Sequence, residues 1–173
     1  MIKFDKSASK YMFTPEDPKG HLCTSSWNKL YGTSRCTFDP HLDSDRFVWR
    51  RAYSCVQFNG QYSVAEKPDC AESDLIELAA YAYDKGAKPF ENQGLLLKEF
   101  KTKVKVDTWY GYKLKIFPTY TQYELSNEDG ELLETITIDH RDCGATYLLG
   151  NLLKFYFGGQ CPAPQEVSAC YRE

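Results

Sequence analysis

The stretch Glu99-Phe100-Lys101-Thr102-Lys103-Val104-Lys105-Val106 decides the fold class of this chain. Its even-numbered residues are Phe, Thr, Val and Val, and its odd-numbered residues are Glu and three Lys. Successive side chains of a β-strand point to opposite faces of the sheet, so the alternation predicts a strand with one face in the core and the other in water. We therefore expect a protein built from sheets.

Similar strand patterns recur along the chain, separated by turn sequences. Asn127-Glu128-Asp129-Gly130 is a tight hairpin sequence between two of them. Residues 75–83 are ambiguous, because their leucines and alanines suit a helix while the Tyr-Ala-Tyr end suits a strand, and we assign them to a strand. The predicted elements are a capped helical turn at residues 25–30, a first strand in the segment up to residue 38, and strands at residues 47–58, 75–83, 99–106, 112–116, 119–125, 132–138 and 147–157.

These patterns predict an all-β fold of about eight antiparallel strands with short connections. Closure into an eight-stranded antiparallel up-and-down barrel would remove the unpaired edges of an open sheet and leave room for one small ligand. A two-sheet sandwich would give nearly the same string of strands, so both architectures stay open here. The 173 residues fit one domain over 1–173, with residues 1–22 as an N-terminal extension and residues 162–173 as a C-terminal tail.

The seven cysteines indicate an oxidising compartment. None of them forms a C-x-x-C pair of the kind that zinc or redox chemistry uses, so disulfide bonds are the better interpretation. We expect a secreted, extracellular protein whose signal sequence has been removed, and no membrane span. Because the number of cysteines is odd, at least one stays free or pairs with another chain.

Charge and motifs exclude several function classes. The formal net charge of -3 argues against a nucleic-acid partner, although six Lys and several aromatic residues between Lys98 and Lys115 resemble a single-strand binding surface. The chain has three His and lacks the sequence motifs of common hydrolases, metalloproteases and phosphate-binding loops. His140 and Cys143 lie three residues apart, which is more typical of strand-end polar residues plus a structural disulfide than of a metal site. We expect no catalytic residue, metal or cofactor.

Two stretches resemble a known family. Phe47-Val48-Trp49-Arg50-Arg51-Ala52-Tyr53-Ser54-Cys55-Val56 resembles the second strand of the tick salivary lipocalins, the group that includes the histamine-binding proteins. Glu128-Asp129-Gly130-Glu131-Leu132-Leu133-Glu134, continuing to Asp142-Cys143 and Tyr147-Leu148-Leu149-Gly150, resembles that family's hairpin and the strands after it. The resemblance covers about residues 25–161 and implies an eight-stranded lipocalin-like barrel.

The resemblance also implies disulfide bonds and cavity residues. It implies the pairs Cys55–Cys170 and Cys143–Cys161, which would tether the C-terminus, while Cys23, Cys36 and Cys70 have no counterpart and two of them could pair. In a hollow barrel the ligand-binding cavity would be lined by Trp49, Tyr112, Tyr123, Leu132 and Glu134.

The family's amine-binding acids are partly missing from this sequence. The residue after Cys143 is Gly144, Asp43 stands where an aromatic residue is expected, and Leu152-Leu153-Lys154-Phe155 carries no acid. A cationic amine needs carboxylates to offset its desolvation. We therefore expect a secreted, non-enzymatic salivary lipocalin that inhibits host defence by binding a host protein, with a complement component such as properdin as the named guess. The alternative is a scavenger that holds a biogenic amine, a leukotriene or another lipid in the barrel, with Lys154 favouring an anionic lipid.

Overall fold

The computed structural model describes residues 1–11, 26–52, 74–84, 96–142, 144, 152–153, 155, 163 and 165–172. Strands dominate this part of the chain, and every strand pair in it is antiparallel, which confirms the predicted all-β class. The elements are β1 (Ile2–Phe4), α1 (Ser7–Lys10), β2 (Asn28–Ser34), β3 (Ser44–Arg51), β4 (Leu75–Tyr83), β5 (Leu97–Glu99), β6 (Val104–Lys105), β7 (Gly111–Ile116), β8 (Tyr120–Ser126), β9 (Leu132–Asp139), β10 (Leu152–Leu153) and β11 (Ala169–Tyr171).

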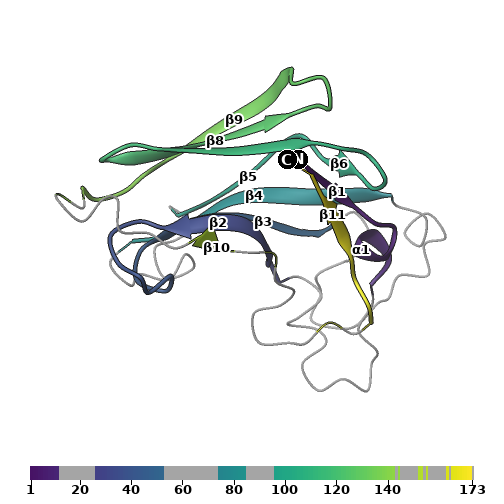
Figure 1. Cartoon of the computed structure of the whole chain (residues 1–173), viewed down its shortest axis with the longest axis horizontal. Helices are drawn as coiled ribbons and strands as arrows, with labels where there is room; N and C mark the ends of the chain where they lie inside the picture. The colour runs from purple at the N-terminus through teal and green to yellow at the C-terminus, as the bar shows by residue number, and fades with distance from the viewer. Residues whose placement is uncertain are drawn as a thin grey trace, which may run out of the picture.

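The strands form three sheets. A six-stranded sheet has the order β10-β2-β3-β4-β5 with β6 also on β4, a three-stranded sheet has the order β7-β8-β9, and β1 pairs with β11. Figure 1 shows the three-stranded sheet on one side of the six-stranded sheet, with the two chain ends beside each other. Within the described residues, the sheets do not close into a barrel.

One hydrophobic core lies between the two larger sheets. β3 and β4 pair along their whole length and place Phe47, Trp49 and Leu78 on its floor, and β8 contributes Tyr123 and Leu125 from the opposite side. All five side chains are fully buried. Burial of a large apolar side chain is worth about 1.5–3 kcal/mol, so this layer supplies the main stabilising term.

Several predicted elements are confirmed. Residues 75–83 form β4, and the hairpin sequence joins β8 to β9. In that turn Gly130 has a φ of 85°, a left-handed conformation that glycine adopts without steric cost, and the Glu131 backbone N–H donates to Asn127 Oδ1 at 2.8 Å. The strand predicted at residues 147–157 is described only at β10, and the end of the one predicted at 47–58 lies outside the described residues.

The prediction of one continuous strand over residues 99–106 is wrong. Its faces are as expected, with Phe100, Val104 and Val106 buried, but it is divided into β5 and β6. The reason lies in the residues between them, because the backbone N–H groups of Lys101 and Thr102 donate to the Glu134 carboxylate and not to β4.

The helical turn predicted at residues 25–30 is also wrong. Residues 28–30 belong to β2, where Asn28 pairs with Trp49 and Lys29 with Val48. Strand pairing and burial of the neighbouring side chains outweigh the local helix preference of residues 25–30. The short helix of the described chain is α1, and it lies within the predicted N-terminal extension, where Ala8 and the following Tyr11 are buried in the core.

The C-terminus is tethered by strand pairing. β11 pairs with β1, with Cys170 opposite Lys3, and Cys170 is an exposed free cysteine. The predicted Cys55–Cys170 disulfide is therefore wrong, because the register of β11 leaves the Cys170 thiol at the surface. Cys36 is disulfide-bonded, and its partner lies outside the described residues, as do Cys23, Cys55, Cys70, Cys143 and Cys161. In the part of the chain described here, no helix is long and apolar enough to cross a membrane.

Candidate functional site

The loop between β2 and β3, residues 35–43, is held closed by its own hydrogen bonds. The Arg35 backbone N–H donates to the Asp43 carbonyl at 3.1 Å, which continues the β2–β3 pairing into the loop. Asp39 organises the tip, since its Oδ1 accepts the His41 N–H at 2.8 Å and its carbonyl accepts the Leu42 N–H at 3.2 Å. Cys36 adds a disulfide bond. This pattern predicts one dominant loop conformation.

A buried ion pair lies at the base of the 35–43 loop. The Arg35 guanidinium contacts the Asp45 carboxylate, and both side chains are completely buried. Arg35 also donates to the Tyr83 carbonyl at the end of β4. Burial raises the pKa of Asp45, and the positive charge of Arg35 opposes that rise. The pair therefore joins the loop to β3 and β4 from inside the protein.

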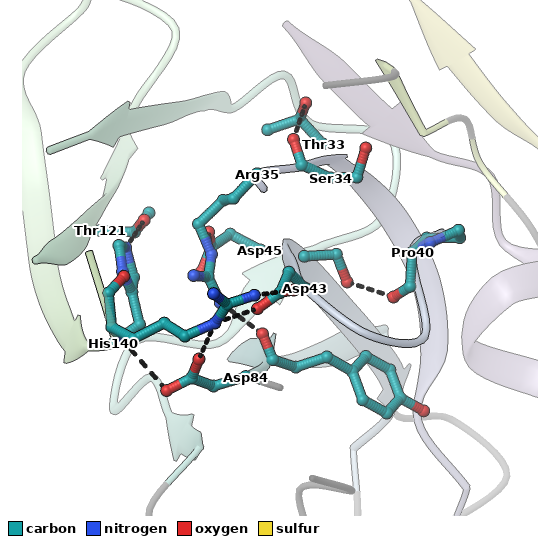
Figure 2. Close-up of polar contacts among 12 residues, drawn as sticks. Thr33, Ser34, Arg35, Pro40, Asp43, Asp45, Asp84, Thr121 and His140 are labelled. Carbon is teal, nitrogen blue, oxygen red and sulfur yellow. Dashed lines mark hydrogen bonds and ion pairs between the residues drawn. The ribbon is translucent and has the colours of Figure 1, made fainter. Parts of the chain in front are cut away.

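A second ion pair connects the same loop to the three-stranded sheet, as Figure 2 shows. Arg141, two residues after β9, contacts both oxygens of buried Asp43, at 3.1 Å from Nε and 2.6 Å from Nη2. Its Nε also lies 3.4 Å from Asp84, the residue after β4. The hydrogen bond to Asp43 raises the pKa of Arg141. Two-pronged Arg–carboxylate pairs fix orientation, so this contact sets the position of the loop against both sheets.

Polar groups of β8 complete the network. The Tyr123 hydroxyl donates to Asp45 Oδ1 at 2.9 Å, and His140 Nε2 lies 3.0 Å from the Thr121 hydroxyl oxygen. The other ring nitrogen of His140 donates to the Arg141 carbonyl at 2.9 Å. Burial, together with the nearby Asp45 charge, raises the pKa of Tyr123 well above its ordinary value, so this hydroxyl stays protonated and donates.

The braced loop presents apolar side chains to water. Phe38 is 63% exposed and Leu42 is 43% exposed, although the residues on either side of the loop are buried. Leu152 of β10, which is 65% exposed, lies opposite Thr33 near the end of β2 that leads into the loop. Exposed aromatic and aliphatic groups on a rigid support are typical of protein-binding surfaces.

Two predicted cavity residues lie in the packed core. Trp49 is completely buried, with its ring centroid 5.0 Å from Phe4, 5.9 Å from Tyr11 and 5.8 Å from Phe155. Tyr123 is also completely buried and uses its hydroxyl on Asp45. These two side chains are surrounded by other side chains of the protein.

The other predicted cavity residues are not gathered with Trp49 around one space. Leu132 is 59% exposed at the start of β9, so its assignment to the cavity is wrong. Tyr112 is half-buried and contacts Phe47 edge-on at 5.4 Å. Glu134 lines an open groove of about 630 Å³ between β9 and residues 98–102, together with Lys98. Partial burial would raise the pKa of Glu134, but the Lys101 and Thr102 backbone donors outweigh it and the pKa is lowered.

No metal site emerges from the described residues. Although Asp43, Asp45, Asp84 and His140 come from four segments of the network, no group of three or more His, Cys, Asp or Glu side chains in the described part of the chain could hold a metal ion. The carboxylates instead face Arg35 and Arg141. These carboxylates therefore act as counter-ions of the two arginines.

Comparison with known proteins adds no relative. No family model, no curated protein and no solved structure matches the chain.

The sequence analysis did not identify the 35–43 loop as a candidate site. The charged residues Arg35 and Asp43 of the loop, and Asp45 and Arg46 at the start of β3, were visible as a cluster around Asp39-Pro40. Nothing local showed that Arg141, 98 residues away from Asp43, would complete it.

Proposed function

We propose that this protein is a secreted, non-enzymatic lipocalin-like protein that inhibits host defence by binding a host protein through the 35–43 loop. The observation that carries the proposal is the pairing of a strongly braced loop with exposed Phe38 and Leu42. A loop that is ordered before binding loses little conformational entropy on association, and exposed apolar side chains then supply the affinity. A complement component such as properdin is the proposed partner, as in the sequence analysis.

The lipocalin-like barrel is part of the same proposal. What supports it is the order of the strands, because β2, β3 and β4 are neighbours in chain order, as are β7, β8 and β9. β10, which follows β9 in the chain, pairs with β2. A last strand beside the first is the arrangement that an up-and-down barrel requires. Nuclear Overhauser contacts between β9 and the chain after residue 142 would support closure, and contacts of β9 restricted to β8 and β5 would favour a sandwich.

The alternative, a scavenger of small molecules, has weaker support. A cationic amine needs a free carboxylate inside the protein, whereas Asp45 is paired with Arg35 and Glu134 accepts two backbone N–H groups at the rim of a groove. Lys154, proposed for an anionic lipid, lies outside the described residues. Native mass spectrometry of the purified protein distinguishes the two hypotheses, because a stoichiometric amine or lipid would favour the scavenger.

The direct test replaces the two exposed apolar side chains of the loop. F38A/L42A should keep the fold but lose inhibition of complement-mediated lysis in host serum and lose capture of the complement component. Y171A removes a side chain that is 71% exposed at the C-terminus and serves as the matched control. Unchanged inhibition by F38A/L42A would refute the loop as the binding surface. A wild-type protein that neither inhibits lysis nor captures a complement protein would refute the complement proposal itself.

A further inference from the structure

A polar cluster lies on the face of the six-stranded sheet that is opposite to the main core, where Val48, Ala79 and Tyr81 belong to a second, smaller buried hydrophobic group. The polar cluster consists of Lys29 on β2, Arg46 on β3, and Tyr81 and Tyr83 on β4, and we call it the Lys29–Arg46 cluster. These three strands are side by side in Figure 1. Arg46 is paired with Gly32 on one side and with Tyr81 on the other, so the cluster spans the width of three strands.

The contacts within the cluster leave donors unused. Lys29 Nζ lies 4.9 Å from the Tyr81 ring centroid and donates to the Trp27 carbonyl at 3.0 Å. Arg46, nine-tenths buried, donates from Nη2 to the Pro40 carbonyl at 3.3 Å, and its buried Nε has no hydrogen-bond partner. The Tyr81 hydroxyl donates to the Tyr83 oxygen at 3.1 Å, which leaves the Tyr83 proton available for another acceptor.

Within the described part of the chain, the two positive charges of the cluster have no counter-ion. Among the described residues, no carboxylate forms an ion pair with Lys29 or with Arg46. Arg50 on the same face of β3 differs, because its guanidinium lies 2.8 Å from Glu77 and 3.2 Å from Glu99. Buried charges are normally paired, so the missing negative charge is what requires an explanation.

The electrostatics agree with this geometry. Burial lowers the pKa of Lys29 to about 8, and the charge of Arg46 contributes to the decrease. Burial also lowers the pKa of Arg46. The protein therefore holds two desolvated cations close together, and a bound anion would relieve both penalties.

A glycine makes the space that Arg46 occupies. A Cβ atom at position 32 would lie 2.7 Å from Arg46 Cγ, so any side chain there would collide with the arginine stem. Lys29 and Tyr83 are only half-buried, so solvent reaches the cluster at these two side chains, whereas Arg46 Nε is buried. Tyr83 contacts the His41 ring at 5.8 Å, so the cluster borders the 35–43 loop.

We propose that the Lys29–Arg46 cluster binds one oxyanion group, a sulfate, phosphate or carboxylate. Arg46 would offer its free Nε–H, Lys29 its ammonium, and Tyr83 its hydroxyl proton. Charge-assisted hydrogen bonds from an arginine, with a second cation nearby, are contacts that proteins use for such groups. The proposal concerns residues other than Phe38 and Leu42 and does not depend on the identity of the host partner.

Isothermal titration with sodium sulfate, sodium phosphate and sodium acetate, at ionic strength held constant with sodium chloride, tests the proposal. The wild-type protein should bind at least one of the three anions saturably with one-to-one stoichiometry. K29M and R46K should each bind about tenfold more weakly, because each loses one charge-assisted contact. K113M, which removes an exposed lysine of β7, should bind like the wild type.

A second measurement keeps the test valid if R46K disturbs the sheet. Nuclear magnetic resonance of the lysine side chains should show that the saturating anion shifts the Lys29 resonance and raises the pKa of Lys29 above about 8. Absence of saturable binding by all three anions would overturn the proposal. Saturable binding that is equally strong in K29M and R46K, with no shift at Lys29, would overturn it as well. A sulfated disaccharide and a glutamate-rich peptide, compared in the same titration, then distinguish a sulfated glycan from an acidic protein as the source of the group.

Discussion

Removal of one member of the Arg35–Asp45 pair should destabilise the protein far more than removal of both. In R35M, the Asp45 carboxylate stays fully buried and keeps the Tyr123 hydroxyl, but it loses its counter-ion. An uncompensated buried charge costs about 3–5 kcal/mol. D45N leaves the Arg35 guanidinium in the same position and should cost a similar amount.

The double variant R35M/D45N separates pairing from packing. It removes both charges of the pair, so it should lose less free energy of unfolding than either single variant, and the coupling between the two substitutions should exceed the loss of one single variant, about 3–5 kcal/mol. With an m-value of about 2 kcal/mol/M, each single variant lowers the urea midpoint by roughly 1.5–2.5 M. The assay is equilibrium urea unfolding followed by tryptophan fluorescence, with the disulfides kept oxidised.

The Lys115–Glu124 pair between β7 and β8 is the matched control, because the Lys115 side chain is 39% exposed. K115M should cost under about 1 kcal/mol. Hydrogen exchange at the Arg35 and Asp43 amides should accelerate in R35M and not in K115M, because R35M removes the ion pair that holds the base of the 35–43 loop. A loss under about 1 kcal/mol in R35M, or single losses that add without coupling, would refute the role given to this pair.

Three further predictions concern separate parts of the molecule. Lys29 has a pKa of about 8 in the folded state against an ordinary 10.5, so between these values the unfolded chain binds more protons and the free energy of unfolding should rise with pH. Urea unfolding from pH 7 to 10.5 should show this rise in the wild type and in K113M but not in K29M, which should also be more stable than the wild type by about 1–3 kcal/mol at pH 7. G32A should lower the free energy of urea unfolding by about 1–3 kcal/mol, because its Cβ would collide with Arg46 and the Asp45 carbonyl. G130A is the contrasting variant, since its Cβ would have nothing within 4 Å and its only strain would be the positive φ. An unchanged free energy of unfolding in G32A would contradict the close packing at Gly32. C170S should leave the thermal midpoint and the non-reducing peptide map unchanged, whereas loss of a Cys55–Cys170 peptide would restore the disulfide that the structure excludes.

Local patterns predicted what depends on neighbouring residues. The alternation in residues 99–106 identified the buried face correctly, because core burial selects Phe100, Val104 and Val106 whatever the strand length. The hairpin at Asn127 was predictable because its turn depends on Gly130 alone in the left-handed region. Residues 75–83 form β4 because pairing with β3 over eight residues outweighs their mixed local preference.

Features made by distant residues were not predictable. The break between β5 and β6 depends on Glu134, more than thirty residues away, which accepts the Lys101 and Thr102 N–H groups. The brace of the 35–43 loop needs Arg141, and the free state of Cys170 follows from the pairing of β11 with β1 at the opposite end of the chain. The family resemblance predicted the Cys55–Cys170 disulfide and a cavity role for Leu132. Both predictions depend on tertiary geometry that the short motifs do not encode.

Photo-crosslinking from position 38 tests the central claim, that the braced 35–43 loop is the surface that binds a host protein. Phe38 is replaced by benzoylphenylalanine, which keeps an aromatic ring at a side chain that is 63% exposed, and the protein is irradiated in host serum. The same replacement at Tyr171 is the control. The account predicts one dominant adduct from position 38, containing a complement protein, and none from position 171. No adduct from position 38, or the same mixture of adducts from both positions, would contradict it.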